Sequence, residues 1–445
     1  MAKHNTRKSL LILILLSLFA GGCSILGLRE DLQVLEKTSL ISGTISVSSL
    51  TDKPICVVLH RDVPGQDRKV LDAYQVIYRR GAFTFRRPPG NYYLVAFEDA
   101  NEDVAFQHDE RVGWHGKPTA LEARPGVNFE GLQIVLRSPE EAKQELPELY
   151  TKTAPTTRLE IDSRHLGEIA PLDSPRFSRE VAELGMWEPV KFWEQYGAGL
   201  FFLEPYDPMK IPIVFVHGMG GTPRNFRSYI HALEGTRFQP LVLHYPSAMR
   251  LPLMAEGFAK YLNELQVRFK FKQLAIVAHS MGGLVSLGAI NRLTSEGKTF
   301  VSSFVSISTP WRGHPGAASG VEHSPAIIPC WYDMAPLSPY LQSLEKTPLP
   351  GGTHYFLLFG YGGSSAWLVG ENSDGTLPLS SMLDARMQKS AVKVVGFNES
   401  HTSILDSMDV SRELSEILSM MTRADETSSA AAMSSDLPHQ DIGKK

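Results

Sequence analysis

The chain has 445 residues, of which 43% are hydrophobic and 21% are charged, and its formal net charge is −4. This composition is typical of folded globular proteins, and the length suffices for two or three domains. Because no domain-wide basic excess is present, nucleic acid is not expected as a partner. Three cysteines without a Cys-x-x-Cys pair exclude a disulfide scaffold and give no support for a zinc ribbon, so we expect no metal and no other cofactor.

The first residues predict an export signal. A basic start at residues 3–8 precedes an apolar run at residues 10–20, which is too short for a bilayer span of about 20 residues. The run ends at Ala20-Gly21-Gly22-Cys23, which resembles the lipobox of bacterial lipoproteins, although Leu is preferred where Ala20 stands. The resemblance implies removal of a signal peptide at 1–22, lipidation of Cys23 and a tether at 23–39. Plain secretion and an uncleaved anchor are the alternatives.

Lipidation of Cys23 would hold the protein on a membrane surface, since each buried CH₂ contributes about 0.8 kcal/mol. Ser24 rather than Asp follows the cysteine, which by resemblance to Gram-negative sorting implies the outer membrane of the cell envelope. Export would also place Cys56 and Cys330 in an oxidising compartment. The apolar neighbours of Cys56 favour a buried thiol, and a disulfide between the two is the alternative.

Residues 40–137 predict a small all-β domain. Short apolar runs are separated by Gly, Pro and Asp turns, as in a β-sandwich. The expected strands are Ile41–Val47, Ile55–His60, Tyr74–Tyr78, Ala82–Arg86, Tyr92–Glu98 and Leu132–Leu136. The stretch Gly81–Asn101, with its Pro-Gly turn and its Asp-x-Asn ending, resembles the prealbumin-like sandwiches of carboxypeptidase-regulatory type. This resemblance concerns the fold, so the protein partner of the domain stays unknown.

Residues 138–198 predict a connector with two short helices at Ser178–Trp187 and Glu188–Tyr196. From residue 199 to 422, short apolar strands alternate with helices, which predicts an α/β fold: a mostly parallel sheet covered by helices on both faces. The expected strands are Ile213–His217, Pro240–His244, Leu274–Ala278, Phe300–Ser306, Tyr355–Phe359 and Val392–Val395. An apolar insertion at 310–353 is either a lid or ordinary packing, and we expect residues 423–445 to be disordered.

The strongest chemical signal is the segment Val277–Gly283, which reads Val-Ala-His-Ser-Met-Gly-Gly between a predicted strand and a predicted helix. A sharp strand-to-helix turn lifts Ser280 out of the sheet and requires small residues two places away on each side. Ala278 and Gly282 meet this requirement, although Gly is usual at both. The helix N-terminus also favours a developing anion. Ser280 is therefore the expected nucleophile, and a plain loop with a buried serine is the alternative.

Ser280 needs a base and an orienting acid, which in this arrangement follow it in the order acid, then histidine. His401 follows the last predicted strand, where the base is expected; the other histidines after Ser280 are His314, His323, His354 and His439. Asp374 is the favoured acid, because its Asp-Gly turn can point the carboxylate across to the next loop. Simple turn chemistry is its alternative role, and the competing acids are Glu371, Asp384 and Asp333.

A glycine-rich segment follows the strand Ile213–His217 and reads Gly218-Met219-Gly220-Gly221. It lacks the Gly-Lys-Ser/Thr ending and the Gly-x-Gly-x-x-Gly spacing of phosphate-binding loops. Its backbone can instead turn N–H groups toward an oxygen above Ser280. The expected oxyanion donors are the N–H groups of Met219 and Met281, each contributing about 3 kcal/mol to the transition state.

Four motifs occur in order: Val-His-Gly-Met-Gly-Gly, Ala-His-Ser-Met-Gly-Gly, Ser308-Thr-Pro-Trp-Arg-Gly and Ser373-Asp-Gly-Thr-Leu-Pro-Leu-Ser. With them, residues 199–422 resemble α/β-hydrolases of the lipase type and are similar to bacterial triacylglycerol lipases and inositol-deacylase-like lipases. The resemblance implies an α/β-hydrolase fold behind the small all-β sandwich. It also implies a carboxylic ester hydrolase with Ser280, Asp374 and His401 in their usual roles, without defining the substrate.

The leading interpretation is a membrane-tethered serine esterase or lipase that acts on an ester or lipid through an acyl-enzyme. An acyltransferase would use the same acyl-enzyme with an alcohol acceptor, and the sequence does not separate the two because they differ in water access. A non-catalytic binding or scaffold protein of the envelope is less favoured, since such a protein has no reason to keep all three groups. Amidase or peptidase chemistry is a further alternative.

Overall fold

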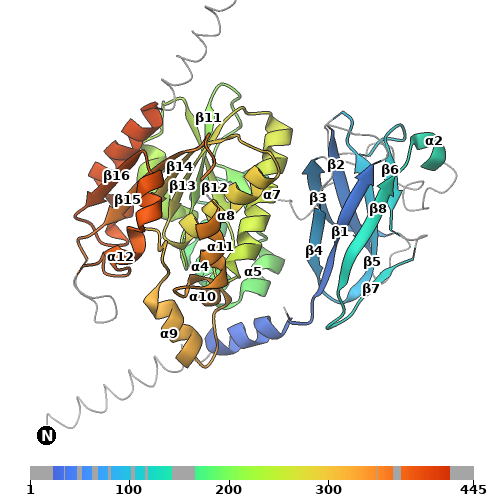
Figure 1. The fold of residues 1–445 in the computed structure, drawn as a ribbon, viewed down its shortest axis with the longest axis horizontal. Coiled ribbons are helices and arrows are strands. Elements are labelled where there is room, and N and C mark those ends of the chain that lie inside the picture. Colours follow the sequence, from blue (N-terminus) through green and yellow to red (C-terminus); the bar gives the residue numbers. More distant parts are fainter. Residues whose placement is uncertain are drawn as a thin grey trace, which may run out of the picture.

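The computed structural model describes residues 24–34, 36–47, 53–62, 69–78, 82–101, 106–115, 119–142, 166–347, 349–363 and 372–420. Within them, an all-β region is followed by an α/β region (Figure 1). The expected signal peptide at 1–22, its Cys23 and the expected disordered tail at 423–445 lie outside the described residues. In the described part of the chain, no helix is both long and apolar enough to cross a membrane.

The all-β region consists of two sheets that share one apolar core. One sheet has the strand order β4-β1-β8 and the other the order β3-β2-β5-β6, with β7 beside β5. Ile41 and Phe83 from the first sheet meet Leu59 from the second in this core. The strands are β1 (Ser39–Val47), β2 (Pro54–Arg61), β3 (Val70–Tyr78), β4 (Ala82–Arg87), β5 (Gly90–Glu98), β6 (Val112–Trp114), β7 (Leu121–Ala123) and β8 (Phe129–Leu136), and α2 (Pro139–Ala142) follows.

The α/β region is built on an eight-stranded sheet with the order β16-β15-β14-β13-β11-β12-β10-β9. Neighbouring strands from β12 to β16 are parallel, whereas β10 is antiparallel to β12. The strands are β9 (Glu168–Ile169), β10 (Gly199–Phe202), β11 (Ile211–Val216), β12 (Phe238–His244), β13 (Leu274–His279), β14 (Val301–Ile307), β15 (His354–Gly360) and β16 (Lys393–Phe397). The predicted α/β fold class with its β-rich N-terminal region is thus confirmed.

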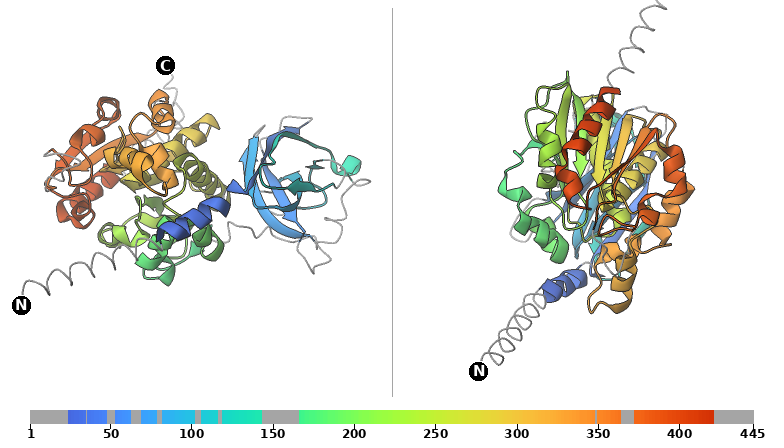
Figure 2. Two further views of the ribbon diagram at one scale, coloured as in Figure 1. Left: turned by 90° about the horizontal axis from the view of Figure 1, so that it is seen from below. Right: turned by 90° about the vertical axis from the view of Figure 1, so that its left-hand side faces the viewer.

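Helices cover both faces of this sheet (Figures 1 and 2). The central strand β13 explains why: Leu274 and Ile276 point into one apolar core, and Ala275 and Val277 point into the other. The helical elements are η1 (Pro175–Phe177), α4 (Arg179–Trp187), α5 (Pro189–Gln195), η2 (Pro223–Phe226), α6 (Arg227–His231), α7 (Leu251–Phe269), α8 (Met281–Ser295), α9 (Pro315–His323), α10 (Pro329–Met334), α11 (Pro339–Lys346), α12 (Leu379–Met382), α13 (Ala385–Ser390) and η3 (Ser403–Asp406), and residues 408–420 form a last helix.

The insertion at 310–353 is largely packed. Cys330 in α10 and Tyr340 in α11 are buried in the same core as α7 and α8. The carboxylate of Asp333 accepts hydrogen bonds from both Nε and a terminal nitrogen of Arg250 and from the backbone N–H of Leu251, each at 2.8 Å. Because α10 is joined in this way to the start of α7, ordinary packing accounts for α10 and α11. Helix α9 differs, since Ala317 is its only buried residue.

The expected tether at 23–39 includes a segment with regular structure. Residues 24–34 form a helix, here called the N-terminal helix, which packs on the α/β region (Figures 1 and 2). Leu28 is fully buried in that core, and Leu32, one turn later, packs against it. The i, i+4 spacing of Leu28 and Leu32 gives this segment an apolar face. Near the end of the expected connector, β9 pairs with β10 and so extends the sheet.

Candidate active site

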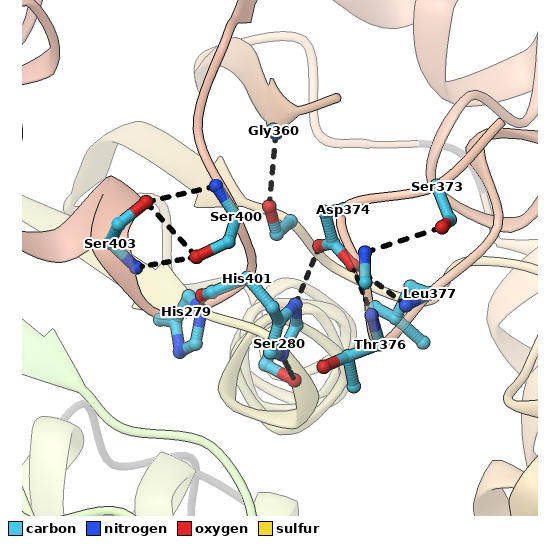
Figure 3. Close-up of polar contacts among 12 residues, drawn as sticks. His279, Ser280, Gly360, Ser373, Asp374, Thr376, Leu377, Ser400, His401 and Ser403 are labelled. Atoms are coloured by element: carbon cyan, nitrogen blue, oxygen red, sulfur yellow. Dashed lines mark hydrogen bonds and ion pairs between the residues drawn. The ribbon is translucent and has the colours of Figure 1, made fainter. Parts of the chain in front are cut away.

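The carboxyl ends of the parallel strands bring the predicted site residues together (Figure 3). Ser280 directly follows β13, Asp374 lies in the segment between β15 and β16, and His401 follows β16. In sheets of this type, residues that leave the carboxyl ends of different strands meet at one edge. Three side chains that are separated by up to 121 positions therefore lie in one place.

Ser280 occupies a strained turn between β13 and α8. Its φ of 55° and ψ of −129° lie in a region that L-residues rarely adopt. Its N–H donates to the carbonyl of Ile307 at 2.8 Å, which holds the turn. A Cβ at Gly282 would come within 2.4 Å of the carbonyl oxygen of Val216, so only glycine fits there. The geometry is that of the expected strand-to-helix elbow.

The three side chains form a continuous hydrogen-bonded chain. Nε2 of His401 lies 2.9 Å from Oγ of Ser280. On the other side of the ring, Nδ1 of His401 lies 2.6 Å from Oδ2 of Asp374. Asp374 is fully buried and His401 is 9% exposed, so the chain leads from the protein interior toward the surface. This order of hydroxyl, imidazole and carboxylate is the one that proton transfer from a serine requires.

Asp374 is held as a carboxylate by its own loop. Its Oδ1 accepts hydrogen bonds from the N–H groups of Thr376 at 2.9 Å and Leu377 at 2.7 Å. Burial alone would raise the pKa of Asp374, but the hydrogen bond and charge of His401, with these two N–H donors, bring the pKa below its ordinary value. Gly375 permits the turn, since its φ is 90°. The carboxylate is therefore both ionised and fixed in direction.

The competing acids lie in other arrangements. Asp333 is paired with Arg250, and Oδ1 of Asp384 accepts from the N–H groups at the start of α13. Glu371 lies outside the described residues. Of the competing histidines, His439 also lies outside them, and the others do not join the chain of Ser280: His314 caps α9, His323 is exposed and bonds within α9, and His354 is exposed at the start of β15.

His279 is a buried residue of the site that the sequence did not single out. Its Nε2 donates to the backbone carbonyl of His401 at 2.8 Å, and the two rings lie 4.7 Å apart (Figure 3). Burial, with the neighbouring His401, lowers the pKa of His279 to about 3, so its ring stays neutral. His279 thus fixes the loop that carries His401. Its position next to Ser280 was the available signal.

The glycine-rich loop lies directly against Ser280. A Cβ at Gly218 would come within 2.9 Å of the Cβ of Ser280. The hydroxyl of Tyr245 donates to the carbonyl of His217 at 2.6 Å, and the N–H of Gly220 donates to Oγ of Ser247 at 2.9 Å. These contacts fix the loop on both sides of Met219.

The N–H groups of Met219 and Met281 were the expected oxyanion donors. In the described part of the chain, neither donates to a protein acceptor. Met219 follows Gly218 in the loop against Ser280, and Met281 is the first residue of α8. The expected function of these two N–H groups thus stays a prediction.

The Ser308-Thr-Pro motif lies next to the strand-to-helix turn at Ser280. Oγ of Ser308 accepts from the N–H of Gly360 at 3.2 Å, and Ser308 itself has a φ of 47°. A Cβ at Gly283 would come within 2.0 Å of Oγ1 of Thr309. The motif thus packs against the first turn of α8, which explains the second glycine after Ser280.

Within the described ranges, no group of three or more His, Cys, Asp or Glu side chains is placed to hold a metal ion. Cys56 is buried in the all-β region and Cys330 in the α/β region, and the two belong to different cores. They do not form a disulfide with each other.

Residues 213–407 match the model of a family described as the alpha/beta hydrolase family. Among solved structures, the mature lipase BlEst2 of Bacillus licheniformis is 18% identical over 46% of this chain and 92% of its own, with a TM-score of 0.39. Lipase B of Aspergillus fumigatus is 16% identical over 46% of this chain and 52% of its own, with a TM-score of 0.35. Phospholipase PlaB from Legionella pneumophila, in complex with thio-NAD, is 16% identical over 39% of this chain and 44% of its own, with a TM-score of 0.34.

No curated protein sequence matches the chain significantly. The family match covers the strands and loops that carry Ser280, Asp374 and His401. It agrees with the sheet order and with the strained turn at Ser280 described above. The α/β region thus has the α/β-hydrolase fold, as the sequence motifs led us to expect, and the family match supports a hydrolase activity.

Proposed function

We propose that the protein hydrolyses carboxylic esters with Ser280 as nucleophile, His401 as general base and Asp374 as the orienting acid. The observation that carries this proposal is the hydrogen-bonded chain from Ser280 through His401 to the buried Asp374, with distances of 2.9 and 2.6 Å. The position of each residue in this chain determines its proposed function. Asp374 keeps Nδ1 of His401 protonated, which leaves Nε2 free to accept the proton of Ser280.

In the first half of the reaction, Oγ of Ser280 forms a bond to the ester carbonyl carbon while its proton moves to Nε2 of His401. The carbonyl oxygen becomes an oxyanion, which the N–H groups of Met219 and Met281 stabilise. When the intermediate collapses, the bond to the alcohol oxygen breaks and His401 returns the proton to the leaving alcohol. An acyl-enzyme on Ser280 remains.

In the second half, His401 takes a proton from a water molecule, whose oxygen attacks the acyl-enzyme. The bond to Oγ of Ser280 then breaks, the proton of His401 restores the hydroxyl, and the carboxylic acid leaves. The neutral state of His279 suits this cycle, because a second cation next to the imidazolium of His401 would oppose its formation.

The proposal includes attachment to a membrane of the cell envelope through lipidated Cys23. It is supported by the apolar run at residues 10–20 and by Ala20-Gly21-Gly22-Cys23 in the sequence. An enzyme held there would meet esters of lipids, which makes a lipid ester the preferred substrate class. Replacement of Cys23 by Ser is expected to release the protein from membranes in a fractionation experiment.

The test is hydrolysis of p-nitrophenyl esters from acetate to palmitate by the wild type and by Ser280→Ala. We expect kcat of Ser280→Ala to fall at least about 10⁴-fold with the fold intact. The matched control is Ser286→Ala, a buried serine two turns further along α8 that is not part of the chain. Turnover of Ser280→Ala near the wild-type rate would overturn the assignment of the nucleophile.

A further inference from the structure

We propose that the N-terminal helix (residues 24–34) is a rigid strut that holds the active-site end of the α/β-hydrolase domain against the lipid bilayer. The inference rests on the proposed ester hydrolysis and on the proposed anchor at Cys23. It adds which face of the molecule meets the membrane. It also defines the substrate more closely, as an ester lipid that resides in the bilayer to which the enzyme is attached.

The N-terminal helix is fixed to the domain by both apolar and polar contacts. Leu28 is fully buried in the hydrolase core. Oδ2 of Asp31 accepts hydrogen bonds from the N–H groups of Val190 at 2.6 Å and Lys191 at 3.3 Å. These groups lie in the first turn of α5 and so have no acceptor within that helix. Gly27 allows the close approach, because a Cβ there would come within 2.9 Å of the Glu188 side chain. A segment held in this way does not act as a slack linker.

The helix is docked next to the elements that border the active site. Its partner α5 follows α4, and the carbonyl of Gly185 in α4 accepts a hydrogen bond from the N–H of Ala248 at 3.2 Å. In the same loop, Oγ of Ser247 lies 3.9 Å from Sδ of Met186 and accepts from the N–H of Gly220 at 2.9 Å. Gly220 follows Met219, the proposed oxyanion donor. A series of contacts through α4 and the loop with Ser247 therefore connects the docking site of the helix to the glycine-rich loop.

The direction of the helix determines where a lipid on Cys23 would lie. Ser24 is already helical, so a lipid on Cys23 would be attached only one residue before the helix in the sequence. Leu26 in the first turn of the helix has 59% of its surface exposed. The helix and α9 lie at the same end of the molecule in Figure 1 and in the right-hand view of Figure 2. The bilayer would therefore meet the end formed by α9 and the N-terminal helix.

The opposite end of the sheet provides a natural reference point. Met209 is 83% exposed and lies just before the amino end of β11. Because β11 and β13 are parallel, Met209 and Ser280 lie at opposite edges of the sheet. A bilayer at the active-site end would leave Met209 in water.

The first experiment measures this orientation without using activity. The full-length lipidated protein carries a fluorophore either at Ser319→Cys, an exposed position on α9, or at Met209→Cys. Both proteins are placed in phosphatidylethanolamine and phosphatidylglycerol vesicles that contain nitroxide-labelled lipid. We expect several-fold stronger quenching at position 319 than at 209. Equal quenching, or stronger quenching at 209, would contradict the proposed orientation of the domain on the bilayer.

The second experiment frees the helix while keeping the lipid. In Leu28→Asp, burial of a carboxylate opposes docking; Asp31→Ala is a milder change that removes only the bonds to α5. Glu30→Gln, at an exposed position of the same helix, is the matched control. We expect the rate on a long-chain ester lipid in vesicles to fall about tenfold in the two docking variants, since a flexible linker lowers the effective concentration. The rate on soluble p-nitrophenyl acetate should stay at the wild-type value.

The two substrates separate this inference from the proposed function. An unchanged rate on the vesicle substrate in both docking variants would overturn the strut while leaving the hydrolase in place. Loss of the soluble rate in Leu28→Asp would indicate damage to the domain, and the vesicle rate of Asp31→Ala then decides whether the strut holds. A wild-type protein that hydrolyses neither ester would refute the proposed function itself. A wild type that hydrolyses the soluble ester but does not float with vesicles would refute the anchor and, with it, the strut.

Discussion

In the α/β region, the side chains of Asp374, His401 and Ser280 are connected and lead from the interior toward solvent, whereas in the all-β region a buried polar side chain bonds to the backbone around it. Gln75 is the example: its amide oxygen accepts from the N–H of Thr84, and its amide nitrogen donates to the carbonyl of Ala82. Both arrangements satisfy buried polar groups. Only the first leaves a reactive atom at its end, so chemistry and stability should respond to different substitutions in the two regions.

The largest effect on activity is expected for a substitution in the hydrogen-bonded chain of the α/β region. Asp374→Asn keeps an acceptor for the N–H groups of Thr376 and Leu377 but removes the charge that orients His401. We expect kcat/KM for an ester to fall about 10³- to 10⁴-fold, by analogy with the same change in serine hydrolases. Steady-state kinetics measures the fall, with circular dichroism to verify the fold.

Asp384→Asn is the matched control for this prediction. Asp384 is also a partly buried carboxylate that accepts from backbone N–H groups, at the start of α13, but it does not contact His401. Its kcat/KM should stay close to the wild-type value. Equal losses in the two variants would mean that Asp374 acts only on stability.

In the all-β region, a substitution is expected to lower stability and leave activity unchanged. Phe83 is fully buried between its two sheets, and Phe83→Ala should lower the local free energy of unfolding by about 3 to 5 kcal/mol. Hydrogen exchange on the full chain, followed by mass spectrometry, measures this loss in the strands around it. The rate of ester hydrolysis per molecule should be unchanged. A large loss of activity would show that the all-β region takes part in the reaction.

A smaller, pH-dependent effect is expected where the two regions meet. Glu264 in α7 is buried and hydrogen-bonded to the hydroxyl of Tyr74 in β3, and Lys260 in α7 donates to the carbonyl of Thr84 at 3.0 Å. Burial raises the pKa of Glu264 to about 7, although Tyr74 and Arg268 partly oppose the rise. The contact between the regions therefore contains a carboxyl that binds its proton more tightly when folded.

Such a raised pKa makes stability fall as pH rises. The contribution of Glu264 is fully present below the ordinary pKa of 4.5 and is lost as pH rises through about 7. We expect the free energy of unfolding to decline over this range by up to about 1.4 kcal/mol per pH unit, and Glu264→Gln to flatten the decline. Chemical denaturation at several pH values measures both. An equal slope in wild type and variant would contradict the prediction.

The sequence predicted the α/β fold and the positions of its site residues because both depend on local patterns. The strand Leu274–Ala278 and the small residues around Ser280 can be recognised without the rest of the chain. The strands β6 and β7 were missed because three residues are too short to show alternation. The function of His279 was missed for another reason: its partner is the backbone of His401, 122 positions away, and a backbone acceptor leaves no mark in the sequence.

The docking of the N-terminal helix was missed for a similar reason. Asp31 caps the start of α5 across 159 positions, so its acceptor function depends on the folded chain. Only the spacing of Leu28 and Leu32 pointed to an apolar face. Residue patterns in the sequence thus do not predict long-range contacts to backbone groups.

The most direct test of the central claim, that Asp374 and His401 activate Ser280, is the rate of labelling by a fluorophosphonate. Mass spectrometry of the full-length protein locates the adduct, and a time course gives the rate in the wild type and in His401→Ala. We expect a single adduct on Ser280 and labelling at least about 10²-fold slower in His401→Ala, since the unassisted hydroxyl is a poor nucleophile. An adduct at another residue, or equal rates in the two proteins, would contradict the account.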